Sequence, residues 1–113
     1  GWSSAMASVI MDNPDRPELA SELEESFCQN NPEIARHFAR VTFLGDNRSD
    51  LKKLTTDTLI IQSKTDAIAS IKVGQFVHDN ISNSKLEVLE TTGHCPHLSA
   101  PSQTIEAMKK HLI

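Results

Sequence analysis

The sequence predicts an α/β protein in which a helical segment comes before a strand–helix–strand–helix unit. Two observations predict this order. Apolar residues recur at helical spacing through most of the first 44 residues. After residue 50 the pattern changes to two short runs rich in apolar and β-branched residues, each followed by a helical pattern. We therefore divide the chain into residues 1–49, all helical, and residues 50–113, a β-α-β-α unit.

Three helices are expected in the first segment. The first covers residues 2–12 and ends at an Asn-Pro pair, because proline disfavours helical backbone in the residue before it. The second begins at residue 17 or 18, where a proline and an acidic side chain suit a first helical turn. Asn31 is expected to cap the third helix, since it comes directly before Pro32 and an acidic residue.

The second segment is expected to form two parallel strands with a helix after each. The strands are predicted at residues 56–62 and 86–90, and the helices at residues 70–81 and 102–113. A parallel sheet is normally covered on both faces and has more members, and two strands alone leave unpaired edges. We therefore expect the chain to be the C-terminal part of a larger α/β protein, and to be molten or to aggregate when isolated.

Composition excludes several classes of function. The chain has 113 residues and a formal net charge of −4, and its Lys and Arg residues are scattered, which argues against nucleic-acid binding. No apolar run approaches the roughly 18 residues of a membrane span, and no signal peptide is visible. Two cysteines far apart, Cys28 and Cys95, predict reduced thiols and a cytoplasmic protein. No cofactor is expected.

An acid and a histidine follow the two predicted strands. Asp66 comes shortly after the first strand, and His94 follows the second strand, directly after Gly93. The carboxyl ends of parallel strands open on one edge of the sheet, so the two side chains are expected to meet there. This is the later part of the serine–acid–histidine order of an α/β-type serine hydrolase. In such a site the histidine moves the serine proton and the acid fixes its tautomer.

Each of these residues also has a simpler interpretation. Asp66 alone is typical of a cap for the helix after it, and His94 alone of a histidine with a structural role in a loop. His94, Cys95 and His97 together resemble metal ligands, but structural zinc needs four ligands, so no metal is expected. Cys95 is a weak candidate nucleophile, since neighbours in sequence rarely reach each other. The other histidines are expected on helices and facing solvent: His37, His78 and His111.

Four stretches resemble a known family. Residues 93–101, Gly-His-Cys-Pro-His-Leu-Ser-Ala-Pro, are similar to the histidine loop of the α/β-hydrolases that include the bacterial stress-response regulator RsbQ and the plant strigolactone and karrikin receptors. Three further stretches resemble RsbQ in particular: Asn-Pro-Asp-Arg-Pro-Glu at 13–18, Ile-Ala-Arg at 34–36, and Asp-Leu at 50–51 with Leu-Ile-Ile-Gln at 59–62. The resemblance covers nearly the whole chain.

The resemblance implies specific roles for parts of the chain. It implies that residues 1 to 44, within the segment 1–49, belong to a helical lid, and that residues 50–113 belong to the C-terminal part of an α/β-hydrolase core. It implies that Asp66 is the triad acid and His94 the triad base. It further implies regulation of a stress-response sigma factor, a phosphatase partner that carries a PAS domain, and a small hydrophobic molecule as substrate or product.

The sequence departs from the family pattern in three places. It contains no G-x-S-x-G motif and no oxyanion loop, so these 113 residues alone are not expected to complete catalysis. Ser70 and Asp57 stand where the family usually has proline, which is expected to loosen the backbone locally without removing chemistry.

Two functions, and a weaker third, follow from these observations. The first is a serine hydrolase acting on a small apolar ester or lactone-like carbonyl compound. The second is a non-catalytic protein that binds a ligand on a hydrolase scaffold and signals to a partner. The third is a free-standing helical adaptor. In the first, large apolar side chains of the lid are expected to line the pocket for the small molecule, although a helix stripe is more often plain packing: Trp2, Met6, Phe27, Phe38 and Phe43.

Overall fold

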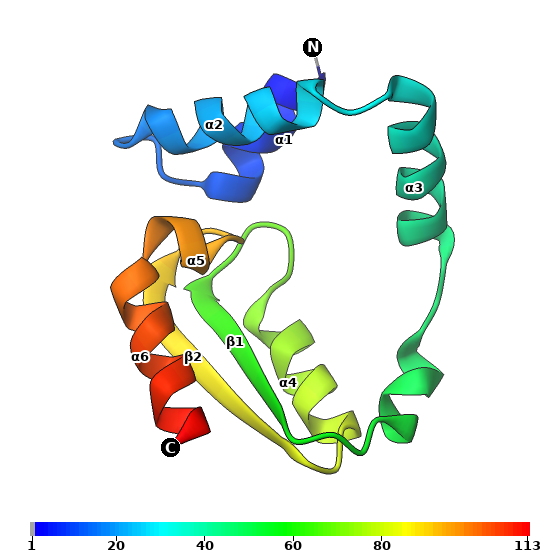
Figure 1. The fold of residues 1–113 in the computed structure, drawn as a ribbon, viewed down its shortest axis with the longest axis vertical. Helices are drawn as coiled ribbons and strands as arrows, with labels where there is room; N and C mark the ends of the chain where they lie inside the picture. The colour runs from blue at the N-terminus through cyan, green and yellow to red at the C-terminus, as the bar shows by residue number, and fades with distance from the viewer. Residues whose placement is uncertain (1) are drawn as a thin grey trace.

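Two parallel strands lie at the centre of the second half of the protein in the computed structural model, which describes residues 2–113 (Figure 1). The strands are β1 (Thr58–Thr65) and β2 (Ser84–Thr92). Ile60 pairs with Leu86, and after an irregularity Thr65 pairs with Thr92. Both strands therefore end at the same edge of the sheet, and the loops that follow them begin side by side.

Helices cover both faces of this sheet. α4 (Ile71–Asn80) contacts both strands on one face, and α6 (Pro101–Leu112) contacts both strands on the other (Figure 1). Leu89 and Ala107 are buried between these layers. α4 approaches β1 closely at Gly74, because a Cβ there would lie 2.7 Å from Gln62 Oε1. This three-layer arrangement and the β-α-β-α order confirm the α/β fold class predicted from the sequence.

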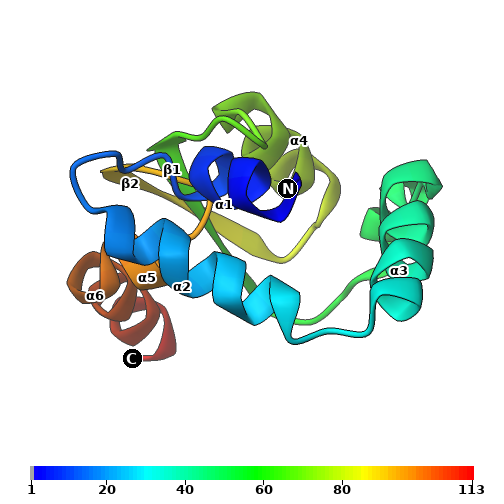
Figure 2. The same cartoon turned by 90° about the horizontal axis from the view of Figure 1, so that it is seen from above.

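The first two helices pack against each other above the edge where the strands end. They are α1 (Trp2–Met11) and α2 (Pro17–Cys28), and both views show them over the loops that follow β1 and β2 (Figures 1 and 2). Trp2 stacks on Phe27 with ring centroids 6.2 Å apart. Ala7 and Met11 are fully buried in this part of the protein.

The third helix, α3 (Pro32–Leu44), lies apart from the sheet and is joined to it through the 3-10 helix η1 (Arg48–Lys53) (Figures 1 and 2). The predicted cap is present, because the Asn31 side chain accepts hydrogen bonds from Glu33 N and Ile34 N. The apolar stripe of α3 is largely exposed, with five large side chains between 61% and 75% accessible: Ile34, Phe38, Val41, Phe43 and Leu44.

Both strands are longer than the sequence pattern predicts. β1 begins at Thr58, later than the predicted residue 56, and continues to Thr65, so Lys64 and Thr65 belong to the strand and not to the loop. β2 runs from Ser84 to Thr92. The added residues are polar, and they join the sheet through backbone hydrogen bonds that need no apolar side chain. Lys64 also forms an ion pair with Glu90 on the neighbouring strand, at 2.9 Å.

The expectation that three helical histidines face solvent is correct for His37 and wrong for the other two. His78 is half-buried, and its Nδ1 lies 2.9 Å from Ser84 Oγ at the start of β2. The His111 side chain is 11% exposed, and its Nε2 lies 3.5 Å from the Asp57 carboxylate. Each contact joins a helix to residues at or just before the start of a strand, six residues away for His78 and far away in sequence for His111, and a helical pattern alone cannot reveal either.

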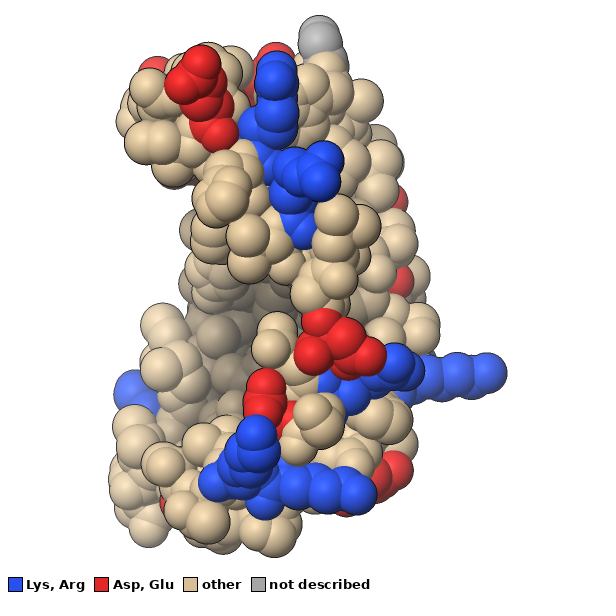
Figure 3. Space-filling view, turned by 90° about the vertical axis from the view of Figure 1, so that its right-hand side faces the viewer, with Lys and Arg blue, Asp and Glu red and all other residues tan. Residues whose placement is uncertain are grey.

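Charged side chains of both signs are interspersed on the face formed by α3, η1 and α4 (Figure 3). Two short-range ion pairs, Arg48–Asp46 and Lys53–Asp50, belong to this region. Among residues 2–113, no helix is both long enough and apolar enough to cross a bilayer.

Candidate active site

Asp66 and His94 meet at the edge where the two strands end. Asp66 directly follows β1, and His94 lies two residues beyond β2. The Nδ1 atom of His94 is 2.8 Å from Asp66 Oδ2, a hydrogen bond between an imidazole and a carboxylate. The Asp66 side chain is only 5% exposed, whereas the His94 side chain is 41% exposed. The acid is therefore held below the surface, and the ring it orients is open to solvent.

The second oxygen of Asp66 binds the loop that follows it. Oδ1 accepts hydrogen bonds from Ile68 N at 2.8 Å and Ala69 N at 3.0 Å. Burial pushes the pKa of Asp66 upward, but the hydrogen bonds from Ala69, His94 and Ile68 outweigh it, so the pKa lies below its ordinary value. The carboxylate is thus ionised at neutral pH.

The alternative interpretation of Asp66 as a helix cap describes only part of its role. The next helix, α4, begins at Ile71, with Ser70 as its N-cap residue. Asp66 instead bonds to amides inside the connecting loop with one oxygen and to His94 with the other. A cap would need only one of these two oxygens.

A buried glutamine fixes the loop that carries the acid. Gln62 is 7% exposed, and its Nε2 donates to Ala69 O and to Ser63 O, each at 3.0 Å. Ala69 is also one of the residues whose amide binds Asp66. Gln62 therefore holds the loop from inside the sheet, a role that the sequence pattern gave no reason to expect.

The histidine loop has its own backbone supports. Gly93 has a positive φ of 115°, which favours glycine, and its N–H donates to Thr65 O at 2.9 Å. The short helix α5 (Pro96–Ser99) follows, and the carbonyl of Cys95 accepts from the amides of Leu98 and Ser99. The residues on either side of His94 are thus held by backbone hydrogen bonds, through the Gly93 amide before it and the Cys95 carbonyl after it.

The alternative roles of the neighbouring residues find little support. Burial raises the pKa of the Cys95 thiol, and the negative charge of Asp66 raises it further, so the thiol is neutral and poorly nucleophilic at pH 7. His97 is exposed on α5. No three His, Cys, Asp or Glu side chains within residues 2–113 gather in the way a metal site requires.

The five side chains predicted to bind a small molecule line one cavity, which we call the lid cavity after the lid that the sequence resemblance implies. It measures about 520 Å³ and lies between the first two helices and α3. Its wall is formed almost entirely by apolar side chains, and Ile10 and Ile34 extend it. The predicted members are Trp2, Met6, Phe27, Phe38 and Phe43.

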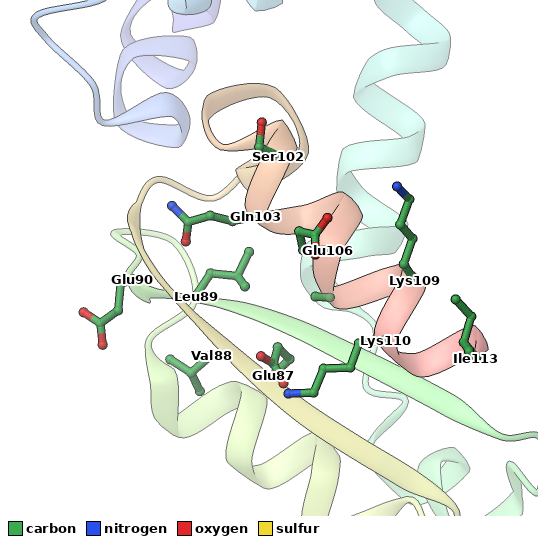
Figure 4. Close-up of a pocket in the computed structure, with 11 residues that line it drawn as sticks. Glu87, Val88, Leu89, Glu90, Ser102, Gln103, Glu106, Lys109, Lys110 and Ile113 are labelled. Atoms are coloured by element: carbon green, nitrogen blue, oxygen red, sulfur yellow. The ribbon is translucent and has the colours of Figure 1, made fainter.

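A larger groove of about 960 Å³ lies between β2 and α6 (Figure 4). Charged residues of both signs line it, among them Glu87, Glu106 and Lys110. Neither Asp66 nor His94 belongs to its wall. Asp66 and His94 do not line the lid cavity either. The charged side chains of the groove make the apolar lid cavity the better candidate for an apolar ligand.

Known proteins resemble this chain in sequence and in structure. It is 30% identical over 112 residues to the karrikin insensitive 2 receptor IA of Petunia hybrida, covering 98% of this chain and 41% of the relative. It is 27% identical to the strigolactone esterase D14 of Arabidopsis thaliana, over 98% of this chain and 42% of the esterase. A solved hydrolase from Oleispira antarctica is 38% identical, with a TM-score of 0.91 over 99% of this chain and 41% of the hydrolase. No family model matches the sequence.

The chain has the fold of the C-terminal part of an α/β-hydrolase. It spans about two fifths of the length of the curated relatives it matches. β1 and β2 are neighbouring parallel strands in this part of the fold. The Asp66–His94 pair lies at their carboxyl ends, where open α/β sheets bind ligands.

Replacing Asp66 with Asn should lower the free energy of unfolding in a pH-dependent way. The folded-state pKa of Asp66 lies below the unfolded-state value of about 3.9, so its contribution is complete above that value. It is lost as the pH falls toward the folded-state pKa. Urea unfolding of the complete protein should show a deficit in Asp66→Asn at pH 7 that shrinks below about pH 4.

Asp46→Asn serves as the control, because that carboxylate is exposed and pairs with exposed Arg48. Its deficit at pH 7 should be small, as for most surface ion pairs. An Asp66→Asn deficit that is the same at pH 7 and pH 3.5 would contradict the assignment of a stabilising, ionised carboxylate.

Proposed function

We propose that the complete protein is a serine hydrolase acting on a small apolar ester or lactone-like carbonyl compound, with Asp66 as triad acid and His94 as triad base. The observation that carries the proposal is the 2.8 Å hydrogen bond between His94 Nδ1 and the buried Asp66 carboxylate at the carboxyl edge of the sheet. The likeness to a strigolactone esterase and to a solved hydrolase supports it.

In this proposal the nucleophile belongs to the part of the complete protein outside these 113 residues. Asp66 holds the proton of His94 on Nδ1, which leaves Nε2 as the basic nitrogen on the exposed side of the ring. Nε2 takes the proton of the attacking serine and then gives it to the leaving oxygen. Asp66 stabilises the imidazolium that exists between these two steps.

The lid cavity supports the choice of an apolar substrate. In the proposal residues 1–49 form the lid over the site and residues 50–113 the core. The cavity volume of about 520 Å³ is within the range of roughly 300–1,000 Å³ typical of small-molecule sites. Its wall offers few polar groups, so it would retain a compound by burying apolar surface. Ile10 lines the cavity, and its carbonyl accepts the His94 amide proton at 2.8 Å.

A signalling role on the same scaffold is the second candidate. The likeness to a protein named as a receptor favours it, since the scaffold then binds a small molecule and reports its presence. Regulation of a stress-response sigma factor and a partner phosphatase with a PAS domain stay predictions from the sequence resemblance. The two candidates differ in whether turnover is needed.

Replacing His94 with Ala in the complete protein should abolish ester hydrolysis. Loss of the base should lower kcat on the order of 10³-fold or more for a p-nitrophenyl butyrate substrate. His97→Ala is the matched control, because His97 is an exposed neighbour in the same loop. Hydrolysis that persists in His94→Ala would overturn the enzyme proposal. Ligand-dependent signalling that survives the loss of hydrolysis would favour the receptor role.

Replacing Phe38 with Ala should weaken binding of apolar acyl groups. Phe38 lines the cavity but is 70% exposed, so its removal should barely change stability. We expect KM to rise about tenfold for a butyryl ester and to change less for an acetyl ester, since less apolar surface is buried. Leu44→Ala is the control, because Leu44 is equally exposed on α3 and lies outside the cavity wall. Equal effects of both variants on KM would contradict a substrate-binding cavity here.

A further inference from the structure

The corner between α1 and α2 contacts the histidine loop at both of its ends and at His94. We propose that this corner, residues 10–16, positions His94, with Asn13 and Arg16 as its positioning residues. The inference rests on the proposed function, because it assigns these residues to the placement of the triad base. Neither residue reaches the reacting atoms in this proposal, and both act through the backbone of the loop.

Both the nitrogen and the oxygen of the Asn13 side-chain amide form hydrogen bonds in this corner. Its Nδ2 donates to Thr92 O at 3.0 Å, where β2 ends and the histidine loop begins. The same nitrogen donates to Met11 O at 2.6 Å, and Oδ1 accepts from Arg16 Nη2 at 3.1 Å. An asparagine side chain can donate two hydrogen bonds, and both are used.

Arg16 binds the other end of the histidine loop. Its Nη2 donates to Ser99 O at 2.9 Å, at the last residue of α5. One guanidinium nitrogen therefore binds Asn13 on one side and Ser99 on the other. Through these two side chains the corner binds both ends of the loop, Thr92 and Ser99, with His94 between them.

The backbone of the corner binds His94 itself. The amide of His94 donates to Ile10 O at 2.8 Å. α1 ends at Met11, so the carbonyl of Ile10 has no partner within the helix and is free to accept this bond. Gly93 lies against the same turn, because a Cβ on Gly93 would clash with Met11 O. Asp12 has a positive φ of 46°, which shows how tightly the corner turns.

These contacts fix the base from two directions. Asp66 orients the ring from β1, and the corner fixes the backbone from which the ring projects. A misplacement of about 1 Å in a catalytic group can cost about 100-fold in rate, so the loop backbone is a sensitive element. Ile10 also lines the lid cavity, so one residue contacts both the proposed substrate site and the base.

The test compares kcat per active site in the complete protein. Asn13→Asp keeps the shape of the side chain but cannot donate to Thr92 O. Arg16→Met removes both bonds of the guanidinium, and Arg16→Lys offers one nitrogen that can serve both acceptors. Matched controls are Asn47→Asp and Arg40→Met, which lie outside the corner and are exposed. Burst titration with p-nitrophenyl butyrate counts the competent sites, so partial unfolding does not lower the measured kcat.

We expect kcat per site to fall about 10- to 100-fold in Asn13→Asp and Arg16→Met, with KM within about threefold of wild type. Arg16→Lys should recover most of the loss, and the two controls should match wild type. If Asn13→Asp does not fold, the Arg16 pair decides, because both Arg16 variants keep the Asn13–Thr92 bond.

Two results for Arg16→Met would overturn the inference: an unchanged kcat per site, or a change in KM alone. In either case the corner would only attach the first two helices to the histidine loop. These outcomes are separate from the proposed function, which is tested by His94→Ala. Loss of activity in His94→Ala together with full activity in Arg16→Met would retain the triad base and reject its positioning by the corner.

Discussion

The parallel pairing of β1 with β2 is the constraint on which the candidate site depends. Because Thr65 pairs with Thr92, the next residues of both strands emerge together at one edge of the sheet. The acid and the histidine are 28 residues apart in sequence, and this pairing brings them to 2.8 Å. An antiparallel pair would have placed the two strand ends at opposite edges. The proposed chemistry therefore requires the parallel direction of the two strands as well as the acid and the histidine that follow them.

A second set of contacts places α1 and α2 over this edge. The α1–α2 corner binds the histidine loop through Ile10, Asn13 and Arg16. The apolar cavity is built from the same helices and from α3. Much apolar surface remains exposed elsewhere, including a stripe along α6 formed by Ile105, Met108 and Leu112.

The features that local sequence determines were the ones predictable from it. The Asn31 cap depends on residues directly beside it, and the order of helices and strands follows from apolar spacing. Asp66 and His94 were predictable because glycine and strand patterns mark the ends of parallel strands. It was also predictable that large apolar side chains of the first three helices come together, since large side chains on helix stripes tend to meet.

Features that depend on distant partners were not predictable in this way. Asn13 and Arg16 each precede a proline, a pattern that indicates only where a helix ends. Their side chains nevertheless bind Thr92 and Ser99, some 80 residues away. His111 reads as a surface residue of a terminal helix, but Asp57 before β1 lies beside it. The polar ends of the strands join the sheet through backbone pairing, which an apolar pattern does not mark. Each of these contacts forms only when the fold brings distant segments together, so no local pattern marks it.

The most direct test of the proposed triad is a crystal structure of the complete protein with a fluorophosphonate bound covalently. The account predicts that the phosphonate modifies a serine on a strand-to-helix turn. It also predicts that His94 Nε2 lies within about 2.6–3.2 Å of that serine Oγ or of the phosphonate oxygen. A modified residue elsewhere, or a His94 ring facing no nucleophile while still bound to Asp66, would contradict the assignment of His94 as the base.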